Sequence, residues 1–329
     1  MSPVVKLGLA FMAFVGLAAP AEAQDYPNRA VKIIVPFGAG GSGDTLARVV
    51  AEHLSATFKQ QFVVENRTGA GGAIGAAAIA SAPPDGYTIG ITNLSILALV
   101  PAINTSVSYH PVSDFTHIAY VAGAPVALAA TPSSDIKTLK EFIATANKSA
   151  KENNKPLTFA SSGVGSDGHL MGVAIGLATN VQLEHVPYRS TSQALTDVVA
   201  GHVALCTFTL SSTAQFLRGG QLNGVAVTSP DRMPDQPELP TFKELGYPQL
   251  VGTTWFSLSG PAKLPVEIAG KLNAEVGRIV AMSDVQARFR RDGFIAQPMS
   301  PAEFTRYVGE EAARWKPLVE TAGLAGKGG

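Results

Sequence analysis

The sequence has few of the features that most directly reveal a function. Cys206 is the only cysteine among 329 residues, which excludes an intrachain disulfide and a cysteine-based zinc cluster. The 25 Lys and Arg residues balance the 25 Asp and Glu residues, and neither a basic tract nor an acidic tail predicts a nucleic acid or a basic protein as partner. The six histidines are scattered and lack the H-E-x-x-H spacing of metalloproteases.

Long hydrophobic runs are absent after the first 20 residues. The chain opens with Lys6, an apolar stretch over 7–19 and the sequence Ala21-Glu22-Ala23. A positive residue, a short apolar stretch and an A-x-A sequence are typical of a secretory signal peptide, and the stretch is too short for a permanent membrane span. We therefore predict a cleavable signal peptide over 1–23 and an exported mature protein, stabilised by burial of its 46% hydrophobic residues.

An alternation of strands and helices follows the predicted signal peptide. Apolar runs predict strands over 31–37, 61–66 and 87–92, with helices over 45–60 and 72–81 between them. This βαβαβ order predicts a parallel sheet with right-handed crossovers.

A second series of strands and helices lies further along the chain. Its strands are predicted over 126–131, 157–161, 183–188, 203–208 and 222–228. A strand that begins at Trp255 and helices over 266–282 and 301–321 then return to the first unit. We predict an α/β protein of two domains, the first formed by 24–123 plus 257–329 and the second by 124–256.

Each predicted domain has a loop rich in glycine and serine directly after a strand. The first reads GAGGSGDT (38–45) and the second ASSGVGSDGH (160–169). Each loop leads into a helix, whose first N–H groups lack helical partners and whose dipole favours a negative charge. Ligands of open α/β sheets bind at the carboxyl ends of strands. The two loops therefore predict a cleft that closes on a small anion.

The first loop also matches two nucleotide motifs. Gly38, Gly40 and Gly43 satisfy G-x-G-x-x-G, and Glu65 stands about 20 residues further on, as in dinucleotide-binding folds. Asp44 argues against both motifs, because it would repel a pyrophosphate and stands where a P-loop has its lysine. An acid here is better placed to accept backbone N–H groups. A carboxylate ligand suits the loop better, and a nucleotide-dependent enzyme is the less favoured alternative. A hydrolase is also disfavoured, because Val164 breaks G-x-S-x-G.

Three longer segments resemble one family. YPNRAVKIIVPFGAGGSGDTLAR, VVENRTGAGGAIGAAAIASAPPDGYTI and VPYRSTSQALTDVVAGHV resemble the Bug-type periplasmic solute receptors, the substrate-binding subunits of tripartite tricarboxylate transporters. The resemblance covers essentially the whole mature chain. It implies a two-lobed Venus-flytrap, type II periplasmic-binding-protein fold with two crossover strands. It also implies a small carboxylate ligand, held partly through ordered water, and delivery to a two-subunit membrane permease.

The same resemblance implies a periplasmic receptor without catalysis, and we expect it to be a monomer that needs no cofactor. A role in sensing, in which ligand occupancy passes to a signalling partner, stays open. Tyr188-Arg189 stand where the family commonly has Tyr followed by Lys or Arg, and Arg189 would suit a distal carboxylate. Ala204 and Phe208 replace residues that are polar in many relatives. Phe208 therefore either packs in the core or gives the cleft an apolar wall, and the same two alternatives are open for Trp255.

The expected role of His169, which opens a helix, is capping or bonding of its loop rather than metal binding. The complete predicted ligand-binding set is Phe37, Gly40, Gly41, Ser42, Asp44, Asn93, Ser161, Ser162, Gly163, Gly165, Ser166, His169, Tyr188, Arg189 and Phe208.

Overall fold

The apolar runs near the start of the chain form the predicted parallel unit. The computed structural model describes residues 26–296, 299–321 and 323–326, so the predicted signal peptide lies outside the described residues. Strands β1 (Val31–Val35), β2 (Phe62–Asn66) and β3 (Thr88–Asn93) pair in parallel in the order β2-β1-β3. Helices α1 (Ser42–Phe58) and α2 (Ala73–Ala80) connect them. α1 begins three residues before the predicted start, so Ser42 to Asp44 belong to its first turn.

The second unit is also present. Its strands are β5 (Leu157–Ser161), β6 (Leu183–Pro187), β7 (Leu205–Thr209) and β8 (Asn223–Val227). Its helices are α4 (Leu139–Asn153), α5 (Asp167–Thr179), α6 (Thr191–Val199) and α7 (Leu210–Arg218). β5 pairs in parallel with β6 and β7, as predicted for strands joined by helices.

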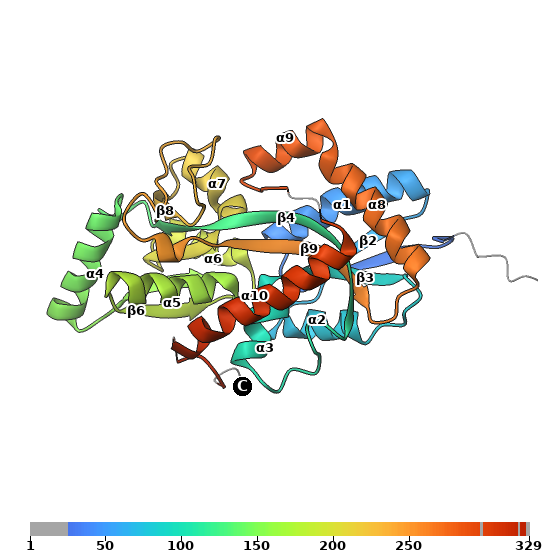
Figure 1. Cartoon of the computed structure of the whole chain (residues 1–329). Helices are drawn as coiled ribbons and strands as arrows, with labels where there is room; N and C mark the ends of the chain where they lie inside the picture. Colours follow the sequence, from blue (N-terminus) through green and yellow to red (C-terminus); the bar gives the residue numbers. More distant parts are fainter. Residues whose placement is uncertain (1–25, 297–298, 322, 327–329) are drawn as a thin grey trace, which may run out of the picture.

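Two long antiparallel strands run between the units and join them. β4 (Phe115–Ala130) pairs with β9 (Thr253–Pro261), and the full strand order is β2-β1-β3-β9-β4-β7-β5-β6, with β8 also on β4. Figure 1 shows both strands crossing the middle of the molecule. The prediction of a strand over 126–131 was too short, because β4 already begins at Phe115. The two-lobed α/β fold with two crossover strands is confirmed.

Several elements were not predicted. They are η1 (Ala70–Gly72), the π-helix η2 (Ser95–Leu99), α3 (Val100–Ile103), α7, η3 (Pro248–Leu250) and α9 (Ser283–Arg291). The two predicted C-terminal helices are α8 (Val266–Ala281) and α10 (Pro301–Thr321). α10 lies diagonally across the face shown in Figure 1 and packs against η2 and β4.

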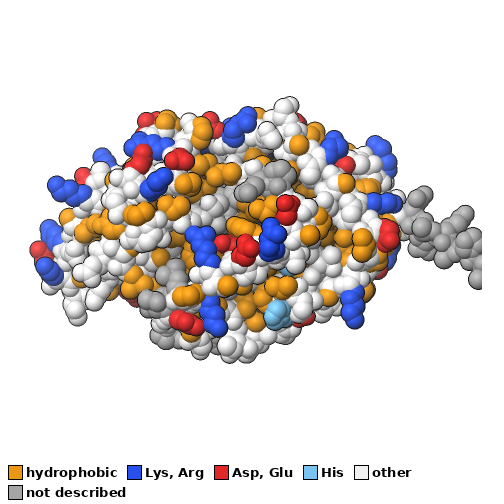
Figure 2. Space-filling view, in the orientation of Figure 1, with side chains coloured by type: hydrophobic (Ala, Val, Ile, Leu, Met, Phe, Trp, Pro, Cys, Tyr) orange, Lys and Arg blue, Asp and Glu red, His pale blue; other side chains and the backbone are white. Residues whose placement is uncertain are grey.

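The buried side chains form separate clusters on the faces of the sheet. One joins β1, α1 and α8 through residues such as Ile33, Leu46 and Leu272, and another surrounds Trp255 and Phe304 under α10. Charged side chains of both signs are dispersed over the face in Figure 2. Within the part of the chain that the structure describes, no helix is long and apolar enough to cross a membrane.

Candidate functional site

A narrow cavity lies where the first loop meets the second lobe; we call it the central cavity. Its volume is ≈ 30 Å³, room for about two water molecules, so the lobes lie close together. The residues lining it are Phe37, Gly41, Ser42, Gly43, Asn93, Ser162, Asp167, Gly168, Thr191, Thr207, Phe208, Thr209, Ser212 and Phe256. Six of these belong to the predicted set: Phe37, Gly41, Ser42, Asn93, Ser162 and Phe208.

Four helices begin at the central cavity. Gly41 caps α1, Asp167 and Thr191 open α5 and α6, and Thr209 caps α7. The first N–H groups of a helix have no helical acceptor, and its dipole places partial positive charge at this end. None of the described lining residues is Lys or Arg. The cavity can therefore attract an anion through helix N-termini alone.

Hydroxyl groups connect the two lobes at this point. Ser42 Oγ lies 2.5 Å from Thr209 Oγ1, 2.6 Å from Ser211 Oγ and 3.0 Å from Ser212 Oγ. Ser192 Oγ on α6 donates to the Ala39 carbonyl at 3.1 Å. The first loop thus contacts the second lobe directly on two of its helices.

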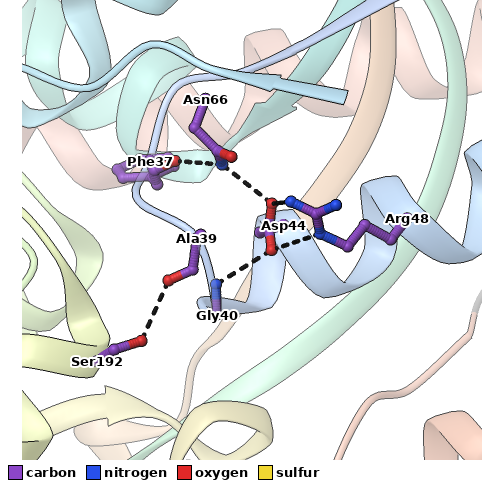
Figure 3. A network of polar contacts seen from close by, with 7 residues as sticks. All are labelled: Phe37, Ala39, Gly40, Asp44, Arg48, Asn66 and Ser192. Carbon is purple, nitrogen blue, oxygen red and sulfur yellow. Dashed lines mark hydrogen bonds and ion pairs between the residues drawn. The ribbon is translucent and has the colours of Figure 1, made fainter. Parts of the chain in front are cut away.

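Asp44 shapes the first loop from behind the cavity (Figure 3). Its side chain accepts from Gly40 N at 3.1 Å, from Arg48 Nε and Nη2 at 2.9 and 3.0 Å, and from Asn66 Nδ2 at 3.0 Å. Burial opposes ionisation, but these hydrogen bonds, with Arg48 foremost, outweigh it and hold the pKa of Asp44 below its usual value. Asp44 and Gly40 therefore order the loop and do not line the cavity.

The second loop is held by two stacked histidines. The rings of His169 and His185 lie 3.9 Å apart at 19°, and His185 Nε2 lies 2.6 Å from Ser161 Oγ. Gly165 N donates to His169 Nδ1 at 3.2 Å, and Ser166 Oγ caps α5 by accepting from His169 N at 3.2 Å. Burial lowers the pKa of His169 to about 4, and burial together with His169 lowers that of His185 to about 3. Both histidines are neutral at pH 7.

These contacts place four more predicted residues behind the cavity rather than in its lining. They are Ser161, Gly165, Ser166 and His169. His169 bonds its own loop, which is the expected role.

Tyr188 and Arg189 line a second, larger space beside the first, here called the outer cavity. It measures ≈ 580 Å³, includes Gly163 and the glycine-rich turn 69–72, and shares Phe37 and Ser162 with the central cavity. Arg189 is exposed. Tyr188 donates its hydroxyl hydrogen to Asp197 Oδ2 at 2.6 Å. Arg189 is thus adjacent to the central cavity without lining it.

The two aromatic residues with alternative roles differ in their positions. Phe208 is 4% exposed, packs with Leu195 and Cys206, and also lines the central cavity. Trp255 is fully buried and donates to Glu311 Oε2 at 3.3 Å. Of the two alternatives left open for Trp255, the structure shows the core position. Neighbouring side chains on a strand point to opposite faces, and Phe256 lines the central cavity instead.

Several lining residues were missed from the sequence. Thr207 and Thr209 end β7, and Thr191 and Ser212 lie in the first turns of α6 and α7. The rule that ligands bind at the carboxyl ends of strands could have found the two β7 threonines. Glu65, considered as a ribose ligand, pairs instead with Lys32 at 2.7 Å and with Arg67.

A two-lobed α/β fold with an anion-attracting cavity between its lobes defines a solute-binding receptor. Residues 46–324 match the model of the tripartite tricarboxylate transporter family receptor, and the chain belongs to this family. It is 32% identical over 314 residues to the protein BugT of Bordetella pertussis, covering 95% of each chain.

Two solved structures are similar over most of the chain. Rpa4515 of R. palustris, solved with adipate, is 34% identical with a TM-score of 0.87, over 92% of this chain and 99% of the other. MatC (Rpa3494) from Rhodopseudomonas palustris, solved with bound malate, is 31% identical with a TM-score of 0.84, over 89% of this chain and all of the other. The likeness is strong enough to support proposals about the ligand class.

Proposed function

We propose that this protein is a monomeric periplasmic receptor that captures a small carboxylate between its lobes and delivers it to a two-subunit membrane permease, without catalysis. The observation that carries the proposal is the convergence of four helix N-termini on a cavity between the lobes. Such an end attracts a carboxylate without a cationic side chain. Adipate and malate in two similar receptors support the ligand class.

The carboxylate binds first at the start of α1. There the N–H groups near Ser42, with bound water, hold one carboxylate, and Phe37, Phe208 and Phe256 form an apolar wall for the body of the ligand. α1 of the first lobe and α7 of the second both begin at the cavity. Because two positive helix ends facing one another repel, an anion between them favours the closed arrangement over the open one. A ligand shifts the balance only through such differential contacts.

Arg189 is the proposed partner of a second carboxylate. A longer dicarboxylate would pass between Phe37 and Ser162, which line both cavities, and reach the outer cavity. Arg189 would hold it there with charge-assisted hydrogen bonds. The lobe boundaries that we propose, after residues 123 and 256, fall inside β4 and β9, so bending of these two strands would move one lobe against the other.

A thermal-shift screen of aliphatic and aromatic mono- and dicarboxylates tests the function, because a ligand that binds only the folded state raises the melting temperature. We expect at least one carboxylate to stabilise the protein. A shift with NAD and with none of the carboxylates would contradict the proposal.

The Arg189→Ala variant tests the second carboxylate contact. Since Arg189 is exposed, its loss should leave the melting temperature unchanged but weaken a dicarboxylate about tenfold, the value of one charge-assisted hydrogen bond. Calorimetric titration with a monocarboxylate of equal length is the control, and it should show no difference between the variant and the wild type. Unchanged dicarboxylate affinity would remove Arg189 from the site.

A further inference from the structure

Among the described residues that line the central cavity, one has an ionisable side chain, and that side chain is an acid. Asp167 is the first residue of α5, and it lines both the central cavity and a small internal space of ≈ 10 Å³ beside β9. Neither lining contains Lys, Arg or His among the described residues. A site that attracts carboxylates through helix N-termini therefore also holds a carboxyl group without a cationic partner.

The immediate neighbours of Asp167 are neutral. Its backbone N–H donates to Ser95 Oγ at 2.8 Å, and this hydroxyl lies 3.3 Å from Asp167 Oδ1, which is a long hydrogen bond. From β9, Thr254 also faces the carboxyl group. Burial raises the pKa of Asp167, and hydrogen bonds from the backbone N–H groups of Asp167 and Gly168 and from Ser95 offset this only in part. Asp167 is half-buried, and a charge withdrawn from water without an ionic partner is costly, so a donor that comes with the ligand would stabilise it.

Electrostatic repulsion is expected between the ligand carboxylate and an ionised Asp167. The cavity is narrow, so a ligand inside it lies close to Asp167, and two negative charges in a water-poor space repel strongly. A bare carboxylate would bring this repulsion without relief. A ligand that carries a hydrogen-bond donor as well would place its carboxylate at the helix N-termini and its donor against Asp167.

We propose that Asp167 is a specificity-determining residue that selects carboxylates carrying a second, hydrogen-bond-donating group, with an ammonium group preferred over a hydroxyl group. This inference rests on the proposed function and names the ligand class within it. The preference follows because an ammonium group supplies both the hydrogen bond and the missing counter-charge. A hydroxyl group supplies the hydrogen bond alone.

Matched ligands that differ only in the donor test the proposal. Succinate, L-malate and L-aspartate share one four-carbon skeleton, and adipate and 2-aminoadipate share a six-carbon one. Calorimetric titration of the wild-type protein at pH 7 should give aspartate the highest affinity, malate the next and succinate the lowest. We expect at least a tenfold difference between aspartate and succinate, and the same direction for the six-carbon pair.

The Asp167→Asn variant removes the charge and keeps the shape of the side chain. It should reduce the difference between aspartate and succinate to less than threefold, while succinate binds as well as before or more tightly. Asp235→Asn is the matched control, since Asp235 is exposed and lies in a different cavity; it should keep the wild-type order. Circular dichroism tests whether Asp167→Asn is folded. An Asp167→Ser variant should show the same loss of preference, which would separate an effect on selectivity from misfolding.

The outcomes distinguish this proposal from the function on which it rests. Three results would overturn the role of Asp167 and leave the receptor function intact. The first is equal affinity for the ligands of one skeleton, and the second is binding of only the acids that lack a donor. The third is an affinity order that stays the same in Asp167→Asn. A succinate affinity that rises tenfold per unit of falling pH, and loses this dependence in Asp167→Asn, would overturn it too, because Asp167 would then donate a proton to a bare carboxylate. Absence of binding by every carboxylate would contradict the receptor function itself.

Discussion

The two glycine- and serine-rich loops have equivalent places in the two lobes, yet their acidic side chains lie in different surroundings. The first loop follows β1 and puts Asp44 at the third position of α1, where it turns back and accepts hydrogen bonds from Gly40, Arg48 and Asn66. The second follows β5 and puts Asp167 at the first position of α5, where it lines the cavity. An acid at the third helical position can reach the N–H groups before the helix.

This difference of two helical positions separates a structural acid from one that faces the ligand. The letters are nearly the same, GSGD at 41–44 and GSDG at 165–168. The charge of Asp44 is satisfied within its own lobe, with Arg48 as ion-pair partner. The supports differ as well, because the second loop rests on two neutral histidines and has no ion pair of this kind in the described part of the chain.

The largest difference in stability is expected between two glycine-to-alanine variants, one in each loop. At Gly168 an added Cβ would lie 2.1 Å from the Thr207 carbonyl oxygen, whereas at Gly43 its nearest neighbour is Phe256 at 3.6 Å. Gly168→Ala should therefore destabilise the protein by about 3 kcal/mol through overpacking between α5 and β7. Gly43→Ala should stabilise it by about 0.5 kcal/mol, because alanine suits a helix better than glycine.

Urea denaturation of both variants measures these free energies. A loss below 1 kcal/mol for Gly168→Ala would show that α5 and β7 can move apart, and that the second loop is as adaptable as the first. Because Gly43 lines the central cavity, Gly43→Ala should also weaken carboxylate binding while it stabilises the fold.

Most of the fold was predictable because its strands are short apolar runs with clear ends. β1, β2, β3 and β5 lie within two residues of the predicted ranges. The full length of β4 was not predictable, since Gly123 and Pro125 fall inside it and normally argue against a central strand. Pro125 is accommodated where β4 passes from one lobe to the other. α9 was missed although the end of α8 was predicted to within one residue, and Ser283 and Asp284 are residue types that commonly begin a helix.

The site was predictable only where it is local in sequence. Both loops were found because glycine and serine between a strand and a helix have a known physical use. The threonines of β7 were within reach of the strand-end rule, but the first turn of α7 reaches the cavity only through the packing of separate elements, which a single sequence does not reveal. The sequence also does not show which way a side chain near a loop points, and Asp44 and Trp255 are examples.

An intermediate effect is expected when the charge of Asp44 is removed. Asp44→Asn replaces an acceptor of four hydrogen bonds by a group that both donates and accepts, so at least one of the four N–H donors loses its acceptor. We expect a loss of about 2 kcal/mol in unfolding free energy and weaker carboxylate binding. The pKa of Asp44 is lower in the folded state than in the unfolded state. Its contribution to the free energy of unfolding is therefore fully present above the unfolded pKa of about 3.9, and it is lost as the pH falls through the folded pKa.

The matched control is Asp284→Asn at the exposed first turn of α9. It should cost no more than about 0.5 kcal/mol, the value of a surface charge at a helix end. Equal losses for the two variants would mean that the network in Figure 3 adds nothing beyond the helix dipole.

The smallest effect concerns the histidines behind the second loop. Their folded-state pKa values of about 4 and about 3 lie below the unfolded value of 6.5, so the unfolded chain binds more protons as the solution is acidified. Stability is then present in full above pH 6.5 and is lost as pH falls from there toward 4 and 3. Between pH 7 and 6 the two histidines should together lower the unfolding free energy by about 1.4 kcal/mol.

Urea denaturation at the two pH values measures this slope. The His169→Gln/His185→Gln variant should reduce the slope without abolishing it, because burial also lowers the pKa of His117 to about 4. Hydrogen exchange should place the lost protection at residues 157–169 and leave 31–45 unchanged, because the charge of Asp44 does not titrate in this range. Equal loss of protection in both segments would mean that acidification opens the lobes together, and the two loops would then share one response to pH despite their different supports.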